Sequence, residues 1–248
     1  KKDQVILYNI SFTANKHKKI NKKYVATKKV LSESSSMIIE NNENFVVINK
    51  PAGVAVQSGT KSRKNILDIL GAKKEFAGSS PYSVHRIDKE TTGLLIVAKN
   101  RKYAQLFTSL FRIRKIHKTY LGIALGQFEQ KKGTLRDDLY YFEAKKKIKA
   151  NAITHYKVLD SNNNYTLLKL NPETGRKHQL RKQLLLHGNP IFGDLKYRFS
   201  DKHLSRKNSL MLHAYKINFS INNIKYTFSV EPPLVFQKFL KEKYLKIF

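Results

Sequence analysis

Apolar side chains occur in short runs along most of this chain, and the spacing within each run separates strands from helices. Continuous runs at Phe45–Asn49 and Leu94–Ala98 predict two buried strands. Between and after these runs, apolar residues recur at helical spacing in 66–70 and 104–110, which predicts two amphipathic helices. From Met37 onward the first half of the chain is therefore predicted to mix strands with helices.

The second half is dominated by strand patterns. The segment Ala152–Leu159 alternates apolar and polar positions, and the turn at 162–164 predicts that it forms a hairpin with Tyr165–Leu170. Further strands are predicted at Tyr120–Leu125, Leu210–Phe219 and Lys225–Val230, and further helices from about Arg176 to His187 and from Pro233 onward. The whole pattern predicts an α+β fold, a mixed and mainly antiparallel sheet flanked by helices and loops.

The beginning of the chain has a different composition from the rest. Residues 1–35 contain nine Lys and two acidic residues, and a Ser cluster at 34–36 closes this stretch. A strand at Gln4–Tyr8 followed by a basic arm or linker is predicted there. We therefore expect a basic N-terminal segment at 1–35 and a globular domain at 36–248.

Composition narrows the classes of partner. With 248 residues and 41% hydrophobic side chains the chain is able to form a packed core, and 48 Lys plus Arg against 18 Asp plus Glu give a net charge of +30. Such a charge favours a polyanion as the partner, and nucleic acid is the first candidate. An anionic membrane is less favoured because the Lys residues do not line one amphipathic helix. No apolar run approaches the roughly 18 to 20 residues that span a bilayer. The absence of Cys excludes thiolate chemistry, and the His spacing favours no metal site.

Three polar stretches are candidates for chemistry. Asp88 lies in a Thr- and Gly-containing loop next to Arg86 and just before a buried strand, so it is a candidate nucleophile, a general base or a turn residue. In the stretch 174–181, His178 and Arg181 are expected to share a helical face that presents a guanidinium to a carboxylate or phosphate, or simply to solvent. Tyr120, on a predicted strand, is either functional or an ordinary half-buried aromatic residue.

Together and in this order, these stretches resemble the pseudouridine synthases of the RluA/RluC/RluD family, closest to the RluC-like branch that acts on large-subunit rRNA. The resemblance spans about Ile38 to Pro233. Its blocks are NKPAG (49–53), HRIDKETTGLLIVAK (85–99), KTYL (118–121), TGRKHQLR (174–181), HGNPIFGD (187–194) and LHA (212–214). The departures are mild, with Ile87 where Leu is usual, Thr92 where Ser is usual and Asn189 where His is common.

The resemblance implies roles for individual residues. Asp88 is implied to be the catalytic aspartate, Tyr120 to stack on the target base, and Arg181 to form an ion pair with the aspartate. Arg86 is implied to enter the RNA where the target nucleotide has flipped out. The remaining residues assigned to the substrate side or its scaffold are His85, Leu180, Thr91, Lys118, Arg176 and His178.

The chemistry of the residues is compatible with this assignment. Isomerising uridine requires no redox change, so no cofactor and no metal are expected, and an ionised carboxylate suffices as nucleophile or charge stabiliser. Burial raises the pKa of a carboxyl group and a neighbouring guanidinium lowers it, so a buried catalytic aspartate needs an arginine partner. Unstacking the target base is offset when an arginine fills the gap and a tyrosine stacks on the base.

The resemblance also implies a pseudouridine synthase fold with a central RNA-binding cleft, and structured RNA as the partner of a monomeric protein. Large-subunit rRNA is the preferred substrate; tRNA, and a non-catalytic RNA-binding or ribosome-assembly role on the same fold, are the alternatives. Residues 1–35 are expected to hold the tail of an alpha-L RNA-binding domain and a linker, with 36–248 as the catalytic domain. The expected location is the cytoplasm of a bacterium, or else the matrix of an organelle.

Overall fold

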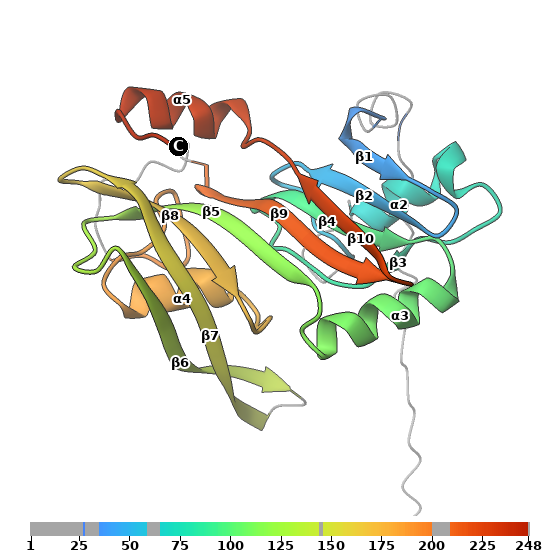
Figure 1. Ribbon diagram of the computed structural model, residues 1–248, viewed down its shortest axis with the longest axis horizontal. Helices are drawn as coiled ribbons and strands as arrows, with labels where there is room; N and C mark the ends of the chain where they lie inside the picture. The colour runs from blue at the N-terminus through green and yellow to red at the C-terminus, as the bar shows by residue number, and fades with distance from the viewer. Residues whose placement is uncertain (1–26, 28–34, 59–64, 144–145, 200–208, 248) are drawn as a thin grey trace, which may run out of the picture.

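The computed structural model describes residues 27, 35–58, 65–143, 146–199 and 209–247. Within them lies a 10-stranded sheet, in which eight strands follow the order β1-β2-β4-β9-β5-β8-β7-β6, while β10 pairs with β9 and β3 with β4 (Figure 1). The strands are β1 (Ile38–Asn41), β2 (Phe45–Lys50), β3 (Tyr82–Ser83), β4 (Thr92–Ala98), β5 (His117–Leu125), β6 (Lys132–Glu143), β7 (Lys146–Ser161), β8 (Tyr165–Pro172), β9 (Leu212–Ile221) and β10 (Ile224–Ser229).

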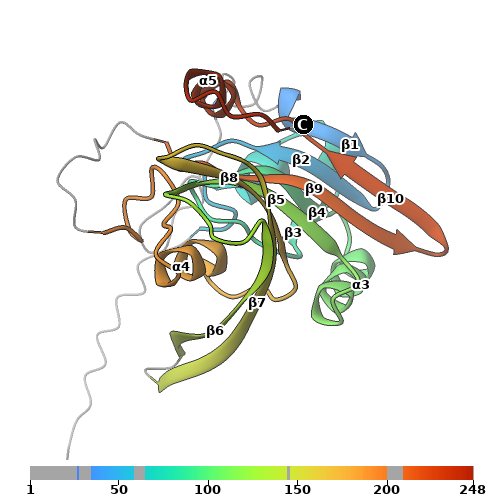
Figure 2. The same cartoon turned by 60° about the vertical axis from the view of Figure 1, so that its left-hand side comes forward.

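Helices cover both faces of this sheet. Figure 2 shows α3 and α4 on one side of the sheet and α5 on the other. The helices are α2 (Ile66–Gly71), α3 (Arg101–Arg112), α4 (Gln179–Leu186) and α5 (Leu234–Glu242), with short 3-10 turns at Ser35–Met37 and Lys74–Phe76. Within the described residues, no helix is long and apolar enough to cross a membrane.

Strand β4 is the centre of one half of the sheet because every one of its seven residues is buried. Its side chains alternate between the two faces. Leu95 and Val97 pack in a core cluster with α2, whereas Leu94 and Ile96 pack on the opposite face in a cluster that includes Phe107 of α3. Burial on both faces explains why the sequence of β4 is continuously apolar rather than alternating.

The two halves of the sheet join at a short parallel pairing. Thr92 and Gly93 at the start of β4 pair with His213 and Ala214 of β9, and every other strand pairing in the described part is antiparallel. Gly93 has a φ of +105°, and a Cβ atom built on it would lie 2.3 Å from the Ala214 carbonyl oxygen. Only glycine therefore permits the two strands to approach this closely.

A buried histidine fixes the same junction. His213 is fully buried; its Nδ1 lies 2.8 Å from the Thr92 hydroxyl and its Nε2 lies 2.9 Å from the Val230 carbonyl oxygen. Since a carbonyl only accepts, Nε2 carries the proton and the Thr92 hydroxyl donates to Nδ1. Burial lowers the pKa of His213 to about 4, although the Val230 carbonyl opposes this shift. The ring is therefore neutral at pH 7 and ties β4, β9 and the chain beyond β10 together.

The predicted fold class and most predicted elements are confirmed, with two differences. The sequence pattern predicted no strand at the positions of β1, β3 and β6, and β6 pairs only with β7. The helix predicted from about Arg176 begins at Gln179 instead. The predicted strand at Gln4–Tyr8 and nearly all of the basic segment 1–35 lie outside the described residues.

The junction gives a stability test. We expect Gly93→Ala to lower the free energy of unfolding by at least about 3 kcal/mol, because the new Cβ meets backbone rather than a flexible side chain. Gly175→Ala is the matched control, since nothing lies within 4 Å of its Cβ position and its φ carries no strain, and it should change stability by less than about 1 kcal/mol. Urea denaturation followed by circular dichroism measures both, and equal stabilities would contradict the close approach.

Candidate active site

A cleft of about 580 Å³ lies beside the junction of the two half-sheets. Three parts of the chain line it: the segment 84–91 that leads into β4, the end of α3 with the start of β5, and the segment 172–181 that leads into α4. The ten residues that the sequence singled out all line this cleft: His85, Arg86, Asp88, Thr91, Lys118, Tyr120, Arg176, His178, Leu180 and Arg181. Segments that are far apart in the sequence therefore contribute to one concave surface.

Asp88 lies in a loop that is fixed by its own backbone hydrogen bond and by a buried lysine. The Thr91 backbone N–H donates to the Asp88 carbonyl oxygen at 3.1 Å, which closes the turn before β4. Lys50, at the end of β2, is completely buried, and its amine donates to the carbonyl oxygens of Pro51, Val54 and Lys89 at 2.7 to 3.0 Å. The three donors of the ammonium group are thus all used, and they connect the β2 exit to the Asp88 loop.

Burying the charged Lys50 amine is unfavourable, and its three hydrogen bonds to loop carbonyl oxygens compensate for the lost hydration. Burial lowers the pKa of Lys50 to about 7, while the nearby carboxylates of Glu90 and Asp88 act in the opposite direction. Because desolvating a charged amine is unfavourable, Lys50 adds little net stability, and its effect is to fix the loop after β2 relative to the Asp88 loop. The sequence block NKPAG carries this lysine, which was not among the site residues that we singled out.

Arg181 is the residue that joins Asp88 to the rest of the protein. It is 8% exposed, and its Nη1 donates to Asp88 Oδ2 at 3.0 Å. On its other edge, Nε and Nη2 donate to the two carboxylate oxygens of Asp194 at 2.7 and 2.8 Å. The guanidinium is therefore bound in bidentate fashion by Asp194 and presents its remaining edge to Asp88. Because Asp194 fixes the plane of the guanidinium, the position of the Asp88 carboxylate that binds its other edge is fixed as well.

Asp194 is a site residue that the sequence reasoning missed. Its side chain is fully buried and also accepts hydrogen bonds from the backbone N–H groups of Lys196 and Tyr197. Burial by itself raises the pKa of Asp194, but the hydrogen bonds from Arg181 and from these N–H groups outweigh burial and hold the pKa below the usual 3.8. The block HGNPIFGD ends on this aspartate, so its place in the motif was the available signal.

The hydrogen bonds to Asp194 and Asp88 also shift the pKa of Arg181. Burial alone lowers the pKa of a guanidinium, but the hydrogen bonds and charges of Asp194 and Asp88 outweigh burial and raise the pKa of Arg181. Arg181 therefore remains charged under all ordinary conditions. An anion that replaces Asp88 as its partner would have to compete with a fixed ion pair.

His178 approaches Asp88 from the other side. Its Nε2 lies 3.7 Å from Asp88 Oδ1, and its Nδ1 lies 2.7 Å from the Tyr197 hydroxyl. The Tyr197 ring also faces the Arg181 guanidinium, with 5.0 Å between the guanidinium carbon and the ring centroid. Burial lowers the pKa of His178, although the Asp88 carboxylate opposes this. Tyr197, another residue that the sequence reasoning missed, thus contacts both side chains that face Asp88.

The expectation that His178 and Arg181 share a helical face is wrong. His178 is the residue before α4 and has a φ of +55°, in the left-handed region. The turn is stabilised by the side chain of Gln179, whose Oε1 accepts from the Thr174 hydroxyl and from the Arg176 backbone N–H. The helix begins only at Gln179 because these bonds hold the preceding residues in a turn. The two predicted residues nevertheless converge on Asp88.

Tyr120 and Lys118 both point from β5 into the cleft. Alternation places them on one face of the strand, while Thr119 between them is buried on the other face. The pairing of β5 with β9 shifts register between Thr119 and Tyr120, and such an irregularity re-aims the side chains beside it. Burial raises the pKa of the Tyr120 hydroxyl and the Asp88 charge raises it further, so Tyr120 stays neutral. Leu180 supplies a buried apolar wall of the cleft.

His85 and Thr91 form the part of the cleft wall that precedes β4. The Nε2 of His85 accepts from the Ile96 backbone N–H at 2.8 Å, and its ring stacks on Phe111 with centroids 4.6 Å apart. Burial and then the Lys118 charge lower the pKa of His85 to about 3, so the ring is neutral and acts as an acceptor. Thr91 is 2% exposed, and its hydroxyl has no hydrogen-bond partner within the described residues.

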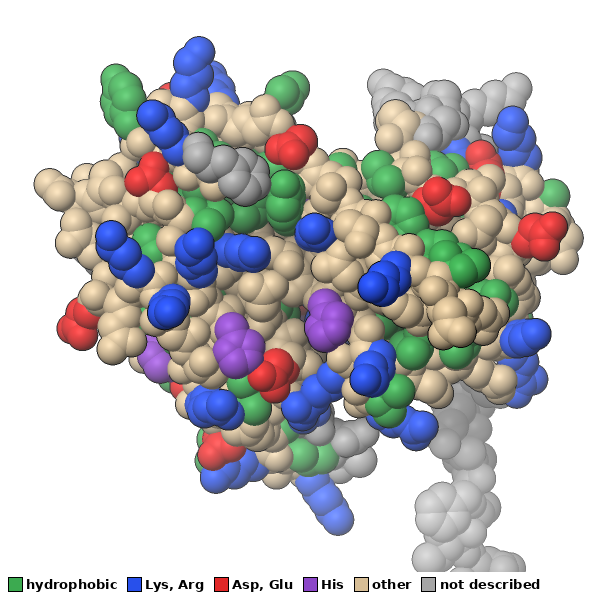
Figure 3. All heavy atoms as spheres, in the orientation of Figure 1, with side chains coloured by type: hydrophobic (Ala, Val, Ile, Leu, Met, Phe, Trp, Pro, Cys, Tyr) green, Lys and Arg blue, Asp and Glu red, His purple; other side chains and the backbone are tan. Residues whose placement is uncertain are grey.

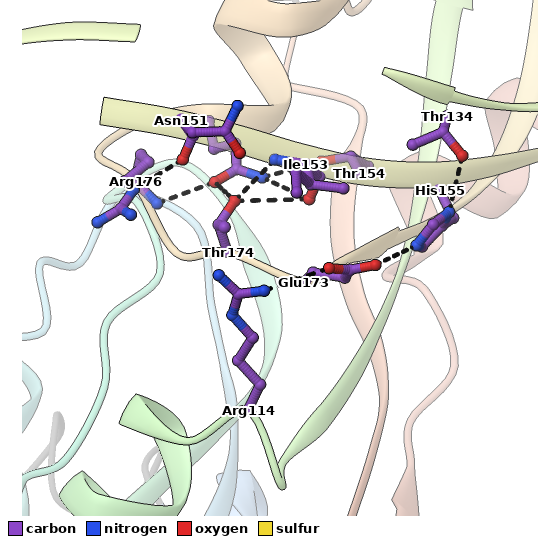
Figure 4. A network of polar contacts seen from close by, with 10 residues as sticks. Arg114, Thr134, Asn151, Ile153, Thr154, His155, Glu173, Thr174 and Arg176 are labelled. Carbon is purple, nitrogen blue, oxygen red and sulfur yellow. Dashed lines mark hydrogen bonds and ion pairs between the residues drawn. The ribbon is translucent and has the colours of Figure 1, made fainter. Parts of the chain in front are cut away.

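Part of the polar network drawn in Figure 4 lines the cleft, through Arg114, Glu173 and Arg176. Arg114, after α3, lies 3.4 Å from Glu173, and Glu173 also contacts His155 of β7. On the other side of this segment, Arg176 donates to the Asn151 carbonyl oxygen at 3.1 Å. The network connects the α3 side of the cleft with the long β6–β7 ribbon.

Positive charge dominates around these groups. Figure 3 shows Lys and Arg side chains spread over the face that it presents, with fewer acidic side chains among them. Arg86 lines the cleft and is exposed, so its guanidinium is accessible from outside. Within the described residues no cluster of three or more His, Asp or Glu side chains is arranged to hold a metal ion.

The fold is a mainly antiparallel α+β sheet, and its cleft holds an aspartate–arginine pair among cationic side chains. The family model for RNA pseudouridylate synthase matches residues 44–186. The chain therefore belongs to this family, and relatives named ribosomal large subunit pseudouridine synthase C and D place it among the RluA/RluC/RluD synthases.

Individual relatives support the same placement. The ribosomal large subunit pseudouridine synthase C of Rickettsia bellii (strain RML369-C) is 36% identical over 202 residues, which cover 77% of this chain and 64% of that protein. The tRNA pseudouridine synthase C of Haemophilus ducreyi (strain 35000HP / ATCC 700724) is 30% identical over 207 residues, covering 74% of this chain and 84% of that protein. Among solved structures, human RNA pseudouridylate synthase domain containing 4 matches with a TM-score of 0.76 and 25% identity, over 88% of this chain and 97% of that one. The chain thus spans less than two thirds of the length of the Rickettsia bellii relative.

The role of Asp194 is testable through stability. We expect Asp194→Ala to lower the free energy of unfolding by about 3 kcal/mol at pH 7, because it leaves a buried guanidinium without its main partner. Because the folded-state pKa of Asp194 lies below 3.8, this stabilisation is complete well above that pH and is lost as the pH falls through and below it.

The matched control removes a carboxylate from a solvent-exposed ion pair. Asp138→Ala breaks the exposed Lys149–Asp138 pair and should change stability by less than about 1 kcal/mol. Urea denaturation at pH 7 and at pH 3 measures both variants. A loss for Asp194→Ala no larger than that for Asp138→Ala would contradict the clamp that we describe.

Proposed function

We propose that this protein isomerises uridine to pseudouridine in RNA, with Asp88 as the catalytic aspartate. The observation that carries the proposal is the ion pair between Asp88 and the buried Arg181 inside the basic cleft. A protein that only bound RNA would have no physical need for a carboxylate held at the centre of its binding surface, because a carboxylate repels phosphate. Membership of the family supports the same activity.

The reaction fits what these side chains are able to do. In the isomerisation the bond between ribose C1′ and uracil N1 breaks, a bond from C1′ to C5 forms, a proton leaves C5 and N1 gains one. No electrons are gained or lost, so the reaction needs no cofactor. The Asp88 carboxylate serves either as the nucleophile or as the group that stabilises positive charge on the sugar, and Arg181 orients it.

The base has to leave its stack to reach Asp88. We assign Tyr120 as the aromatic surface on which the target base stacks, since its ring lines the cleft and its hydroxyl stays neutral. We assign the exposed Arg86, two residues before Asp88, to the space that the flipped nucleotide leaves in the RNA. Leu180 packs beside the reacting groups, while Arg176 and His178 contribute to the basic wall.

We propose large-subunit rRNA as the substrate of residues 36–248, which we take as the catalytic domain. Relatives named for large-subunit rRNA include the synthases C and D of several bacteria, which supports this substrate and, with it, a bacterial cytoplasm as the proposed location. The similarity to a tRNA synthase makes tRNA the second candidate. A monomer suffices, because one chain supplies every group assigned above.

Asp88→Asn is the direct test of catalysis. Replacing the carboxylate by a neutral amide of the same shape should reduce tritium release from [5-³H]uridine-labelled RNA by more than about 10³-fold, since the amide neither attacks nor stabilises positive charge. The affinity for RNA should stay within about twofold or increase slightly, because a negative charge has been removed. Turnover within tenfold of the unsubstituted protein would remove Asp88 from the chemical step.

The substrate class follows from the same assay with two RNA pools. Bulk rRNA and bulk tRNA, each labelled at uridine C5, are incubated separately with the protein, with Asp88→Asn as the control. We expect release from rRNA that is absent with the variant. Release from tRNA alone would overturn the rRNA assignment, and release from neither pool would favour a non-catalytic RNA-binding role.

A further inference from the structure

Lys118 faces the cleft without a counter-ion. Two carboxylates line the cleft, and both have other partners: Asp88 accepts from Arg181, and Glu173 contacts Arg114 and His155. In the part of the chain that the structure describes, no hydrogen bond or ion pair joins the Lys118 amine to another side chain. Arg86, Arg112 and Lys177 of the cleft wall also form no ion pair in the described part of the chain, but they are exposed. Lys118 is thus the half-buried cation of this wall that has no ion-pair partner there.

The position of this amine is costly in the free protein. Lys118 is half-buried, and burial lowers its pKa to about 8. Its neighbour His85 has a pKa of about 3 and is neutral, so it offers no charge to compensate. The other titratable or charged groups of the cleft are Arg86, Asp88, Arg112, Arg114, Tyr120, Glu173, Arg176, Lys177, His178 and Arg181, in which cations outnumber anions. An unpaired ammonium in such surroundings is a site for an anion from outside.

The geometry of β5 limits which anion this is. Lys118 and Tyr120 project from the same face of one strand, two residues and therefore about 7 Å apart. That separation is comparable with the distance between the base of a nucleotide and its own or the adjacent phosphate. We propose that Lys118 binds a backbone phosphate next to the target uridine while the base of that uridine lies against Tyr120. This inference rests on the proposed function and adds a phosphate subsite to it.

Binding of phosphate at Lys118 has a consequence for pH. Only the protonated amine attracts phosphate, and the bound phosphate raises its pKa, so RNA binding takes up a proton above the pKa of the free protein. At pH 9, one unit above that pKa, only about a tenth of the free protein carries the charge. RNA affinity should therefore fall between pH 7 and pH 9, by up to about tenfold.

Two substitutions at one position test the subsite. The dissociation constant of the 248-residue chain for an unmodified large-subunit rRNA transcript is measured at pH 7, 8 and 9 and at several salt concentrations. Lys118→Met should weaken binding about tenfold at pH 7 and lower the slope of log K against log salt by about 0.7 to 0.9, the loss of one phosphate contact. Lys118→Arg keeps a charge at every pH, so it should bind as tightly at pH 7 but lose the part of the pH dependence that Lys118 causes. Any part that arises from Lys50, whose pKa is about 7, is common to both proteins.

Controls separate this effect from general charge and from folding. Lys169→Met removes one exposed lysine of β8 that does not line the cleft, and its affinity should stay within about twofold of the unsubstituted chain. The melting temperature of Lys118→Met should equal or exceed that of the unsubstituted chain, because a poorly solvated charge has been removed. The inference is overturned if Lys118→Met binds with the original affinity and salt slope, or if Lys118→Arg keeps the original pH dependence.

Failure of this inference is distinguishable from failure of the proposed function. Tritium release from rRNA together with unchanged binding by Lys118→Met would leave the synthase activity in place and remove the phosphate subsite. Weaker binding by Lys118→Met without any tritium release would keep the subsite and overturn the activity. Absence of RNA binding by the unsubstituted chain would overturn both.

Discussion

The arrangement of the cleft depends on one buried guanidinium shared by two carboxylates. Asp194 binds Arg181 in bidentate fashion and fixes its plane, and the remaining edge of the guanidinium holds Asp88. Because Asp194 is itself fixed by backbone N–H groups at 196 and 197, the position of Asp88 is determined from the far side of the cleft as well as by its own loop. Arg181 is therefore the physical connection between the two halves of the site.

Buried ion pairs of this kind are a poor source of net stability, because desolvating the charges offsets most of their attraction. Their value here is geometric. The Lys50 amine donates all three of its hydrogen bonds to carbonyl oxygens of the two loops. The neutral His213 ring is held between Thr92 and Val230. Gly93 permits the close approach of β4 to Ala214. Each feature lies within or next to the segment that carries Asp88. The fold thus commits several buried polar groups to fixing one loop, as expected for a preorganised site.

The sequence predicted the strongly patterned parts of the fold and most of the cleft. Strand β4 was recognisable because burial on both faces makes it continuously apolar. Strand β6 was missed because its inward-facing positions include Gly133 and Asp137 beside Leu135 and Leu139, so apolar and polar residues do not alternate along it. His178 was placed in a helix because the turn depends on the side chain of Gln179, which spacing alone does not reveal. Asp194 and Tyr197 were missed as site residues because their role arises from contacts across the fold.

The most direct test of this account is the single-turnover rate of Asp194→Asn on labelled rRNA, measured beside its RNA affinity. Asp194 is fully buried and does not line the cleft, so it acts on Asp88 through other side chains: directly through Arg181, and also through Tyr197, which contacts His178. If Asp194 positions Asp88 through Arg181, the rate falls by about 10- to 100-fold, because the Asp88 carboxylate is no longer aligned with the reacting atoms of the substrate. RNA affinity stays within about twofold. An unchanged rate in a folded Asp194→Asn protein would show that the guanidinium clamp does not position Asp88, and would contradict the account.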